Sequence, residues 1–168
     1  EQEAGSDAMD PRDAIRTLDE VLPAERLVGT DGGHFRKWVL DGITAPPEMS
    51  IISCDFSAVG LGMPMGIGIG QFLEANRRAG EEERTAVTFC GDGGFMMSLH
   101  ELETAVRHEI PVIIVVWNDS SLGAEYHAMA VRGVDPDIAM MSTPELATLA
   151  EAIGAEGRVA HTTEDIEE

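Results

Sequence analysis

Apolar and polar residues alternate along the chain in blocks that predict a repeated order of strand, turn and helix. Residues 85–90 form a short run of β-branched, aromatic and small apolar side chains, which is typical of a buried strand. Residues 95–108 follow with apolar side chains at helical spacing, and residues 112–117 form a second apolar run. This order predicts two parallel strands joined by a right-handed crossover.

The rest of the chain extends the same pattern. We predict further strands over residues 26–29, 49–54 and 157–160, and helices over residues 11–22, 35–40 with Trp38 packed inward, 62 onward, 143–152 with Thr143 as N-cap, and 162–168. The predicted fold class is α/β, with a parallel sheet of about five to six strands and helices on both faces. Residues 1–9 read as a polar linker, and residues 1–168 as a single domain.

Two polar turns follow the central strands and carry complementary chemistry. Gly91, Asp92, Gly93 and Gly94 follow the first strand, and Asn118-Asp119 follows the second. The carboxyl ends of parallel strands are where open α/β sheets bind ligands. Glycine-rich turns expose backbone N–H groups that suit a phosphate, and carboxylates suit Mg²⁺. The alternative is that both aspartates only cap helices, as Asp commonly does.

A second glycine-rich stretch covers residues 60–70 and allows a rival interpretation. Its spacing, Gly60-x-Gly62-x-x-x-Gly66, is one residue longer than a dinucleotide fingerprint, and no acidic residue ends a strand at the distance that such a site requires. Close packing of a helix would use small residues equally well. The stretch alone therefore does not identify a ligand.

Composition narrows the class of partner. The chain is 43% hydrophobic and 25% charged, as in a globular protein, and its net charge of −20 argues against nucleic acid and anionic membranes as partners. Cys54 and Cys90 end apolar runs without a CxxC motif, so buried thiols in a reducing cytoplasm are expected. We find no apolar run of membrane-spanning length and no signal peptide in the sequence.

The two turns also resemble a family signature. GDG at residues 91–93 followed by Asn118-Asp119 is similar to the GDG…NN motif of thiamine diphosphate-dependent enzymes. The stretch GDGGFMMSLHELETAVRHEIPVIIVVWNDSSLG resembles the diphosphate-binding domain of the acetolactate synthase, benzoylformate decarboxylase and pyruvate decarboxylase group, and the likeness extends from about residue 11 to residue 165. It implies a thiamine diphosphate-binding fold with thiamine diphosphate and Mg²⁺ as cofactors.

The resemblance also implies roles for individual residues. The metal ligands would be Asp92, Asp119 and the backbone carbonyl of Ser121. The cofactor-binding set would be Gly33, His34, Ala58, Val59, Gly60, Gly91, Asp92, Gly93, Gly94, Asp119, Ser121, Leu122 and Gly123. Within it, Val59 aligns with the apolar side chain that supports the thiazolium ring. Asp119 replaces the family asparagine and adds a negative charge beside the diphosphate.

The resemblance places the remaining chemistry outside this chain. The catalytic residue of the family is a glutamate on a separate pyrimidine-binding domain of the same or another chain, so we expect a fragment or subunit of a larger homodimer or tetramer. The implied function is a part of a 2-oxo acid decarboxylase or carboligase, a lyase or transferase with a small 2-oxo acid substrate that Glu125, Tyr126 or His127 could contact. The alternatives are a catalytically idle partner or regulatory homologue, and another α/β nucleotide-phosphate-binding domain.

Overall fold

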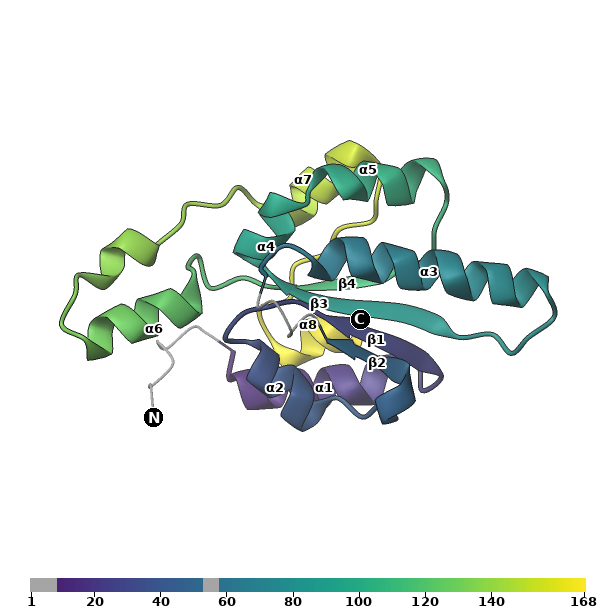
Figure 1. Ribbon diagram of the computed structural model, residues 1–168, viewed down its shortest axis with the longest axis horizontal. Helices are drawn as coiled ribbons and strands as arrows, with labels where there is room; N and C mark the ends of the chain where they lie inside the picture. Colours follow the sequence, from purple (N-terminus) through teal and green to yellow (C-terminus); the bar gives the residue numbers. More distant parts are fainter. Residues whose placement is uncertain (1–8, 53–57) are drawn as a thin grey trace.

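A parallel sheet forms the centre of the computed structural model, which describes residues 9–52 and 58–168 (Figure 1). The strands are β1 (Arg26–Thr30), β2 (Ser50–Ile52), β3 (Thr85–Gly91) and β4 (Ile113–Trp117), in the spatial order β2-β1-β3-β4. All paired strands are parallel. The predicted α/β class is confirmed, with four strands in the described residues in place of five to six.

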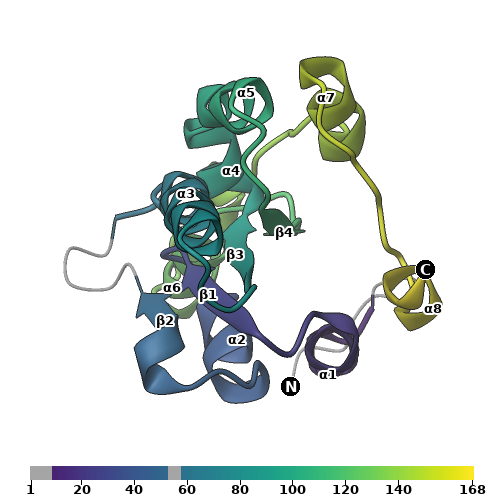
Figure 2. The same cartoon turned by 90° about the vertical axis from the view of Figure 1, so that its right-hand side faces the viewer.

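Helices cover both faces of this sheet (Figure 2). Successive side chains of β3 point to opposite faces, so each face carries apolar side chains that pack against helices. Val87 and Phe89 pack with residues of α1 (Pro11–Val21) and α2 (Arg36–Gly42) on one face. Ala86 and Cys90 pack on the other face, where α3 (Gly62–Arg78), α4 (Asp92–Met97) and α5 (His100–Arg107) lie. The core therefore consists of two apolar layers with the sheet between them.

The remaining elements lie around this core. They are the short 3-10 turns η1 (Pro47–Met49) and η2 (Pro136–Ala139) and the helices α6 (Gly123–Val131), α7 (Leu146–Ile153) and α8 (Thr163–Glu167). Helix α7 lies beside α5, and α8 lies beside α1 (Figure 2). Within the described ranges, no helix combines the length and the apolar character needed to cross a membrane.

The prediction of a single helix over residues 95–108 is wrong, because the structure divides this segment between α4 and α5. The break falls at Ser98, which is buried and whose hydroxyl donates to the carbonyl of Gly94 at 3.1 Å. The backbone N–H of Ser98 then bonds the carbonyl of Phe95, three residues back. A serine side chain that competes for a helical carbonyl in this way ends regular helix.

Two details of the C-terminal segment also differ from the prediction. Residues 157–160 form no strand; Gly157 packs against the backbone of Ala147 instead. The N-cap of α7 is Glu145 and not Thr143, because the Glu145 carboxylate accepts from the backbone N–H groups of Ala147 at 2.9 Å and Thr148 at 2.6 Å.

Two further predictions concern single side chains. Trp38 is partly exposed, and α2 instead buries its neighbour Val39, with Phe35 just before the helix. Cys90 is fully buried, as expected. Cys54 and the end of the strand predicted over residues 49–54 lie outside the described residues, as does the predicted linker apart from Met9.

Candidate functional site

Three turns meet at the carboxyl edge of the sheet and line one shallow hollow. They follow β1, β3 and β4, and the loop before α3 adds Val59. The lining residues are Gly32, Gly33, His34, Phe35, Val59, Gly91, Asp92, Gly93, Gly94, Trp117, Asp119, Ser121, Leu122, Gly123, Ala124 and Glu125. The structure thus brings together the predicted site residues, with Ala58 and Gly60 flanking Val59 in the chain. Their roles in binding stay predictions.

Asp92 is a buried carboxylate of this hollow, and its surroundings raise its pKa. It begins α4, is 1% exposed, and its Oδ1 accepts from the backbone N–H of Gly93 at 2.8 Å. Its Oδ2 is buried and has no hydrogen-bond partner among the residues that the structure describes. Burial raises the pKa of Asp92, the N–H of Gly93 opposes this, and the negative charge of Asp119 raises it further. A cation at this oxygen would satisfy it and favour the ionised form.

Asp119 is held differently, in a tight turn that it forms with Ser120 and Ser121. Its Oδ1 accepts from the backbone N–H of Ser121 at 3.0 Å and from the Ser121 hydroxyl at 2.9 Å. Ser120 between them has a φ of 56°, in the left-handed region. Non-glycine residues are held in this region where the surrounding structure over-determines the turn, commonly at functional sites.

Ala139, the last residue of η2, and Met141 just after it form a clamp on this turn through backbone hydrogen bonds. The N–H of Leu122 donates to the carbonyl of Ala139, and the N–H of Met141 donates to the carbonyl of Ser120, both at 2.8 Å. The side chain of Met141 also lies against Gly93. Sequence reasoning did not single out Ala139 or Met141, because backbone pairing between distant segments has no side-chain signature.

Close approach of neighbouring side chains explains two of the glycines of the hollow. A Cβ on Gly123 would lie 2.6 Å from Nδ1 of His34 and 2.8 Å from Oδ2 of Asp119, and a Cβ on Gly94 would overlap the carboxylate of Asp31. His34 itself approaches Oδ2 of Asp119 at 3.7 Å, and its ring lies 4.9 Å from that of His127. The result is a cradle of bare backbone beside two carboxylates.

Asp31 lies in the turn that the sequence predicts after the first strand, but sequence reasoning gave it no role in the site. It is fully buried at the end of β1, and its carboxylate accepts from three backbone N–H groups: Gly32 at 2.8 Å, Gly60 at 2.9 Å and Leu61 at 3.2 Å. The signal that could have identified it is an acidic residue directly between a buried strand and a glycine pair. Its place beside Gly60 joins the loop of Val59 to the edge of the sheet.

These observations fit a metal ion that carries a diphosphate. The orphaned oxygen of Asp92 calls for a cation, and Gly94 and Gly123, in the first turns of α4 and α6, would offer backbone N–H groups to phosphate oxygens. Among the described residues, the lining of the hollow includes no lysine or arginine, so a metal ion and backbone N–H groups would provide the positive charge on this side of the site.

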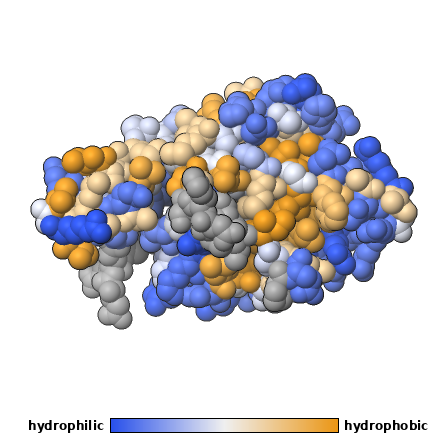
Figure 3. All heavy atoms as spheres, in the orientation of Figure 1, coloured by the Kyte–Doolittle hydropathy of each residue, from blue (hydrophilic) through white to orange (hydrophobic). Residues whose placement is uncertain are grey.

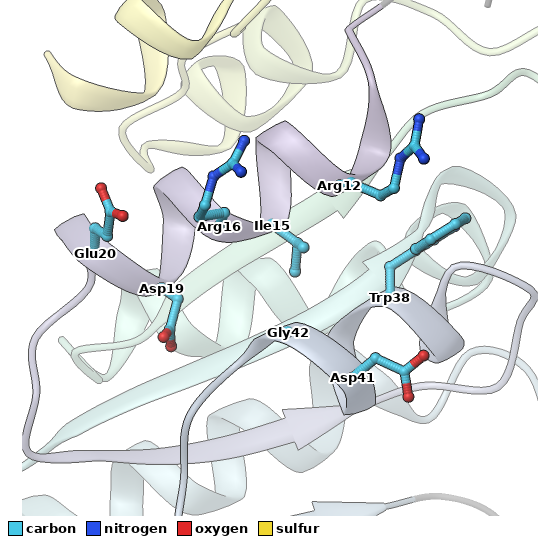
Figure 4. Close-up of a pocket in the computed structure, with 8 residues that line it drawn as sticks. All are labelled: Arg12, Ile15, Arg16, Asp19, Glu20, Trp38, Asp41 and Gly42. Carbon is cyan, nitrogen blue, oxygen red and sulfur yellow. The ribbon is translucent and has the colours of Figure 1, made fainter. Parts of the chain in front are cut away.

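A larger hollow of about 350 Å³ lies between α1 and α2, and Figure 4 shows its lining side chains. Arg12, Arg16, Asp19 and Glu20 come from α1, and Trp38 and Asp41 from α2. Arg12, Arg16 and Asp41 form ion pairs with residues of their own helix or its N-cap. None of the predicted site residues lines this hollow, so we attach no ligand to it.

Comparison with known proteins identifies the class that this fold and site define. The sequence model for the C-terminal TPP-binding domain of thiamine pyrophosphate enzymes matches residues 31–168, so the chain belongs to this family. The predicted recognition is confirmed. Thiamine diphosphate with a divalent metal is the cofactor of these enzymes, so the predicted cofactor class is confirmed as well.

Named relatives extend this assignment. The chain is 29% identical to the sulfoacetaldehyde acetyltransferase of Alcaligenes xylosoxydans xylosoxydans, covering 96% of this chain and 26% of the relative. It is also 29% identical to the large subunit of acetolactate synthase isozyme 3 from Escherichia coli K12, covering 95% and 27%. The chain therefore spans about a quarter of the curated relatives that it matches.

Solved structures confirm the fold. The benzoylformate decarboxylase of Polynucleobacter necessarius superposes with a TM-score of 0.83 at 20% identity, covering 99% of this chain and 31% of that one. At this identity, the likeness supports the architecture and not the substrate. The relatives are enzymes by name, acyl-transferring or decarboxylating, which agrees with the predicted lyase or transferase class.

Proposed function

We propose that this chain supplies the Mg²⁺- and diphosphate-binding wall of the active site in a 2-oxo acid decarboxylase or carboligase. The observation that carries the proposal is the buried, unpartnered Oδ2 of Asp92 beside the cradle of Gly93 and Gly94. When bound, thiamine diphosphate supplies an electron sink for the carbon atom that loses CO₂ or gains a new bond. The residues of this chain would hold and orient that cofactor.

Individual residues receive distinct tasks in this proposal. Asp92, Asp119 and the carbonyl of Ser121 would ligate Mg²⁺. The N–H groups of Gly93 and Leu122 already donate to Asp92 and Ala139, which leaves those of Gly94 and Gly123 as the proposed donors to the diphosphate. His34 would contact the same end of the cofactor, since it lies 3.7 Å from Asp119. Val59 would support the thiazolium ring from the loop before α3. Tyr126 and His127 lie beside one another, and His127 lies beside His34, which makes them candidates for contact with the small 2-oxo acid.

The proposal includes a pyrimidine-binding domain, on the same or another chain, within a homodimer or tetramer. Val59 (38% exposed), which lines the hollow, supports this contact, as do the exposed side chains of Leu61 (48%) and Met97 (56%). Leu61 lies two residues after Val59, and Met97 packs against Gly60 between them. A catalytically idle homologue is a weaker candidate, since the uncompensated Asp92 carboxylate has no use without a cation. A cytoplasmic location belongs to the same proposal and rests on the buried Cys90 thiol.

The test is the variant Asp92→Asn, followed by titration calorimetry with thiamine diphosphate and Mg²⁺. We expect the affinity for thiamine diphosphate with Mg²⁺ to fall by about 100-fold or more, because a charged metal ligand is removed. The pKa of Asp92 is raised in the fold, so its ionised form destabilises the metal-free protein at neutral pH. The asparagine variant should therefore melt no lower than the parent without metal, which separates lost binding from lost folding.

The matched control is Asp41→Asn, which removes the same charge from the exposed face of α2. It should leave the affinity for cofactor unchanged. If Asp92→Asn binds thiamine diphosphate and Mg²⁺ as tightly as the parent, the metal site lies elsewhere. If the parent binds ATP or NAD in preference to thiamine diphosphate, the assigned ligand class is wrong.

A further inference from the structure

We propose that Asp31 is a positioning residue that sets the place of Val59 under the cofactor ring, and does so without touching the cofactor. The inference deepens the proposed function, on which it rests. It concerns a residue that lies beneath the hollow and takes no part in metal or phosphate binding.

The carboxylate of Asp31 bonds the peptide group that joins Val59 to the next residue. Its Oδ2 accepts from the N–H of Gly60 at 2.9 Å, and that N–H belongs to the peptide whose carbonyl is that of Val59. Its Oδ1 accepts from the N–H of Leu61 at 3.2 Å. Two successive N–H groups directly after Val59 are therefore tied to one side chain.

Asp31 is itself held firmly by the sheet. Its backbone N–H donates to the carbonyl of Phe89 at 2.9 Å, where β1 and β3 end side by side. Its side chain is fully buried, and a Cβ on Gly62 or on Gly94 would collide with it. A carboxylate that is enclosed and accepts three hydrogen bonds is held in place, so it links the position of the sheet to that of the Val59 loop.

The loop itself needs this support. Gly60 has a φ of 93° and forms a turn that exposes Val59 to the hollow at 38% of its surface. An exposed side chain on a turn of this kind is not fixed by packing. The bonds from Asp31 fix it instead, and a fixed apolar support would select one placement of the ring.

The experiment compares two ligands on the assembled protein: thiamine diphosphate with Mg²⁺, and inorganic diphosphate with Mg²⁺. Only the first carries the ring. Asp31→Asn keeps the size of the side chain but turns one acceptor into a donor that faces N–H groups. We expect it to weaken thiamine diphosphate binding about tenfold and to change inorganic diphosphate binding less than about twofold. Asp31→Ala, which introduces no donor, should show the same discrimination between the ligands.

A double-mutant cycle with Val59→Ala tests the route of the effect. If Asp31 acts through Val59, the double variant should bind thiamine diphosphate no more weakly than Val59→Ala alone. The control is Thr88→Val, which removes the 2.7 Å bond from the Thr88 hydroxyl to the carbonyl of Gly62 at the same helix start. It lowers stability without touching the peptide of Val59, so both ligands should bind as in the parent.

The proposal is overturned if the Asp31 variants weaken both ligands equally, weaken neither, or add their full effect to that of Val59→Ala. Each of these results requires a parent that binds thiamine diphosphate with Mg²⁺. A parent that binds neither ligand contradicts the proposed function itself, so the two failures are distinguishable.

Discussion

Asp92 and Asp119 differ in how much of each carboxylate the protein already uses. One oxygen of Asp119 accepts two hydrogen bonds from Ser121, and its side chain is 37% exposed. Asp92 is buried with one oxygen unpartnered. In the proposed site, Asp92 would therefore be the stronger metal ligand, and Asp119 would add a charge to a turn that Ser121 already shapes.

This difference leads to a prediction for Asp119→Asn, which restores the residue of the family motif. The amide oxygen can still accept from Ser121, so the turn should persist. Binding of Mg²⁺ alone should weaken by roughly tenfold, because one attraction is lost. Binding of Mg²⁺ together with thiamine diphosphate should stay equal or improve, since the variant also removes repulsion from the diphosphate. Paired titrations, with and without saturating cofactor, measure both quantities; if neither changes, Asp119 does not touch the metal.

Most of the hollow could be predicted from sequence because its residues follow strands directly. Asp92 and Asp119 each end an apolar run, so topology alone brings them to one edge. The role of Asp31 was harder to predict, because its partners Gly60 and Leu61 lie about thirty positions away in the sequence and donate only backbone N–H groups. The clamp of Ala139 and Met141 was missed for the same reason.

At the scale of the element, α3 owes its place to its contact with β3. Thr88 in β3 donates a buried hydrogen bond to the carbonyl of Gly62, and Gly66 lies directly against the Thr88 side chain. Gly68 on the same helix faces open space. Sequence analysis left open whether the glycines of residues 60–70 bind a ligand or allow close helix packing. At Gly66, the structure shows close helix packing.

Two alanine substitutions on α3 test this reading. Gly66→Ala should lower the free energy of unfolding by about 1–3 kcal/mol, because its Cβ would overlap Thr88, whose hydrogen bond opposes rotation. Gly68→Ala, the matched control, should raise it by about 0.5–1 kcal/mol through the better helix propensity of alanine. Urea unfolding of both variants measures the difference. Equal effects of the same sign would show that the contact with β3 does not set the position of α3.

Elements whose limits depend on side-chain hydrogen bonds were predicted less well than those set by apolar periodicity. The apolar spacing of residues 95–108 continues across Ser98, yet its buried hydroxyl ends α4 there. The valine of residues 157–160 favours a strand, yet the segment pairs with no described strand, and Gly157 packs against the backbone of Ala147 in α7. Strand formation needs a neighbouring strand as well as propensity.

At the scale of the molecule, exposed apolar side chains gather around α3 (Figure 3), and a partner on that face would cover them. Figure 3 shows apolar side chains gathered over the middle of one face, around α3, with polar residues toward its margins. Exposed Leu61 and Phe72 belong to the start and the outer side of that helix. With a net charge of −20, the remaining surface would repel a second copy of itself, so an apolar or metal-mediated contact is needed for assembly.

The last prediction concerns the 168-residue chain purified alone. Its hollow encloses only about 40 Å³, whereas binding pockets for ligands of cofactor size reach several hundred Å³, which supports the proposal that the chain forms one wall of a larger site. In the proposed function, the proton-relaying glutamate would lie on the pyrimidine-binding domain. We therefore expect weak binding of thiamine diphosphate and no release of CO₂ from pyruvate or benzoylformate above that caused by free cofactor with Mg²⁺. Faster decarboxylation by the isolated chain would show that it holds a complete active site and would overturn the assignment of the missing half to another domain.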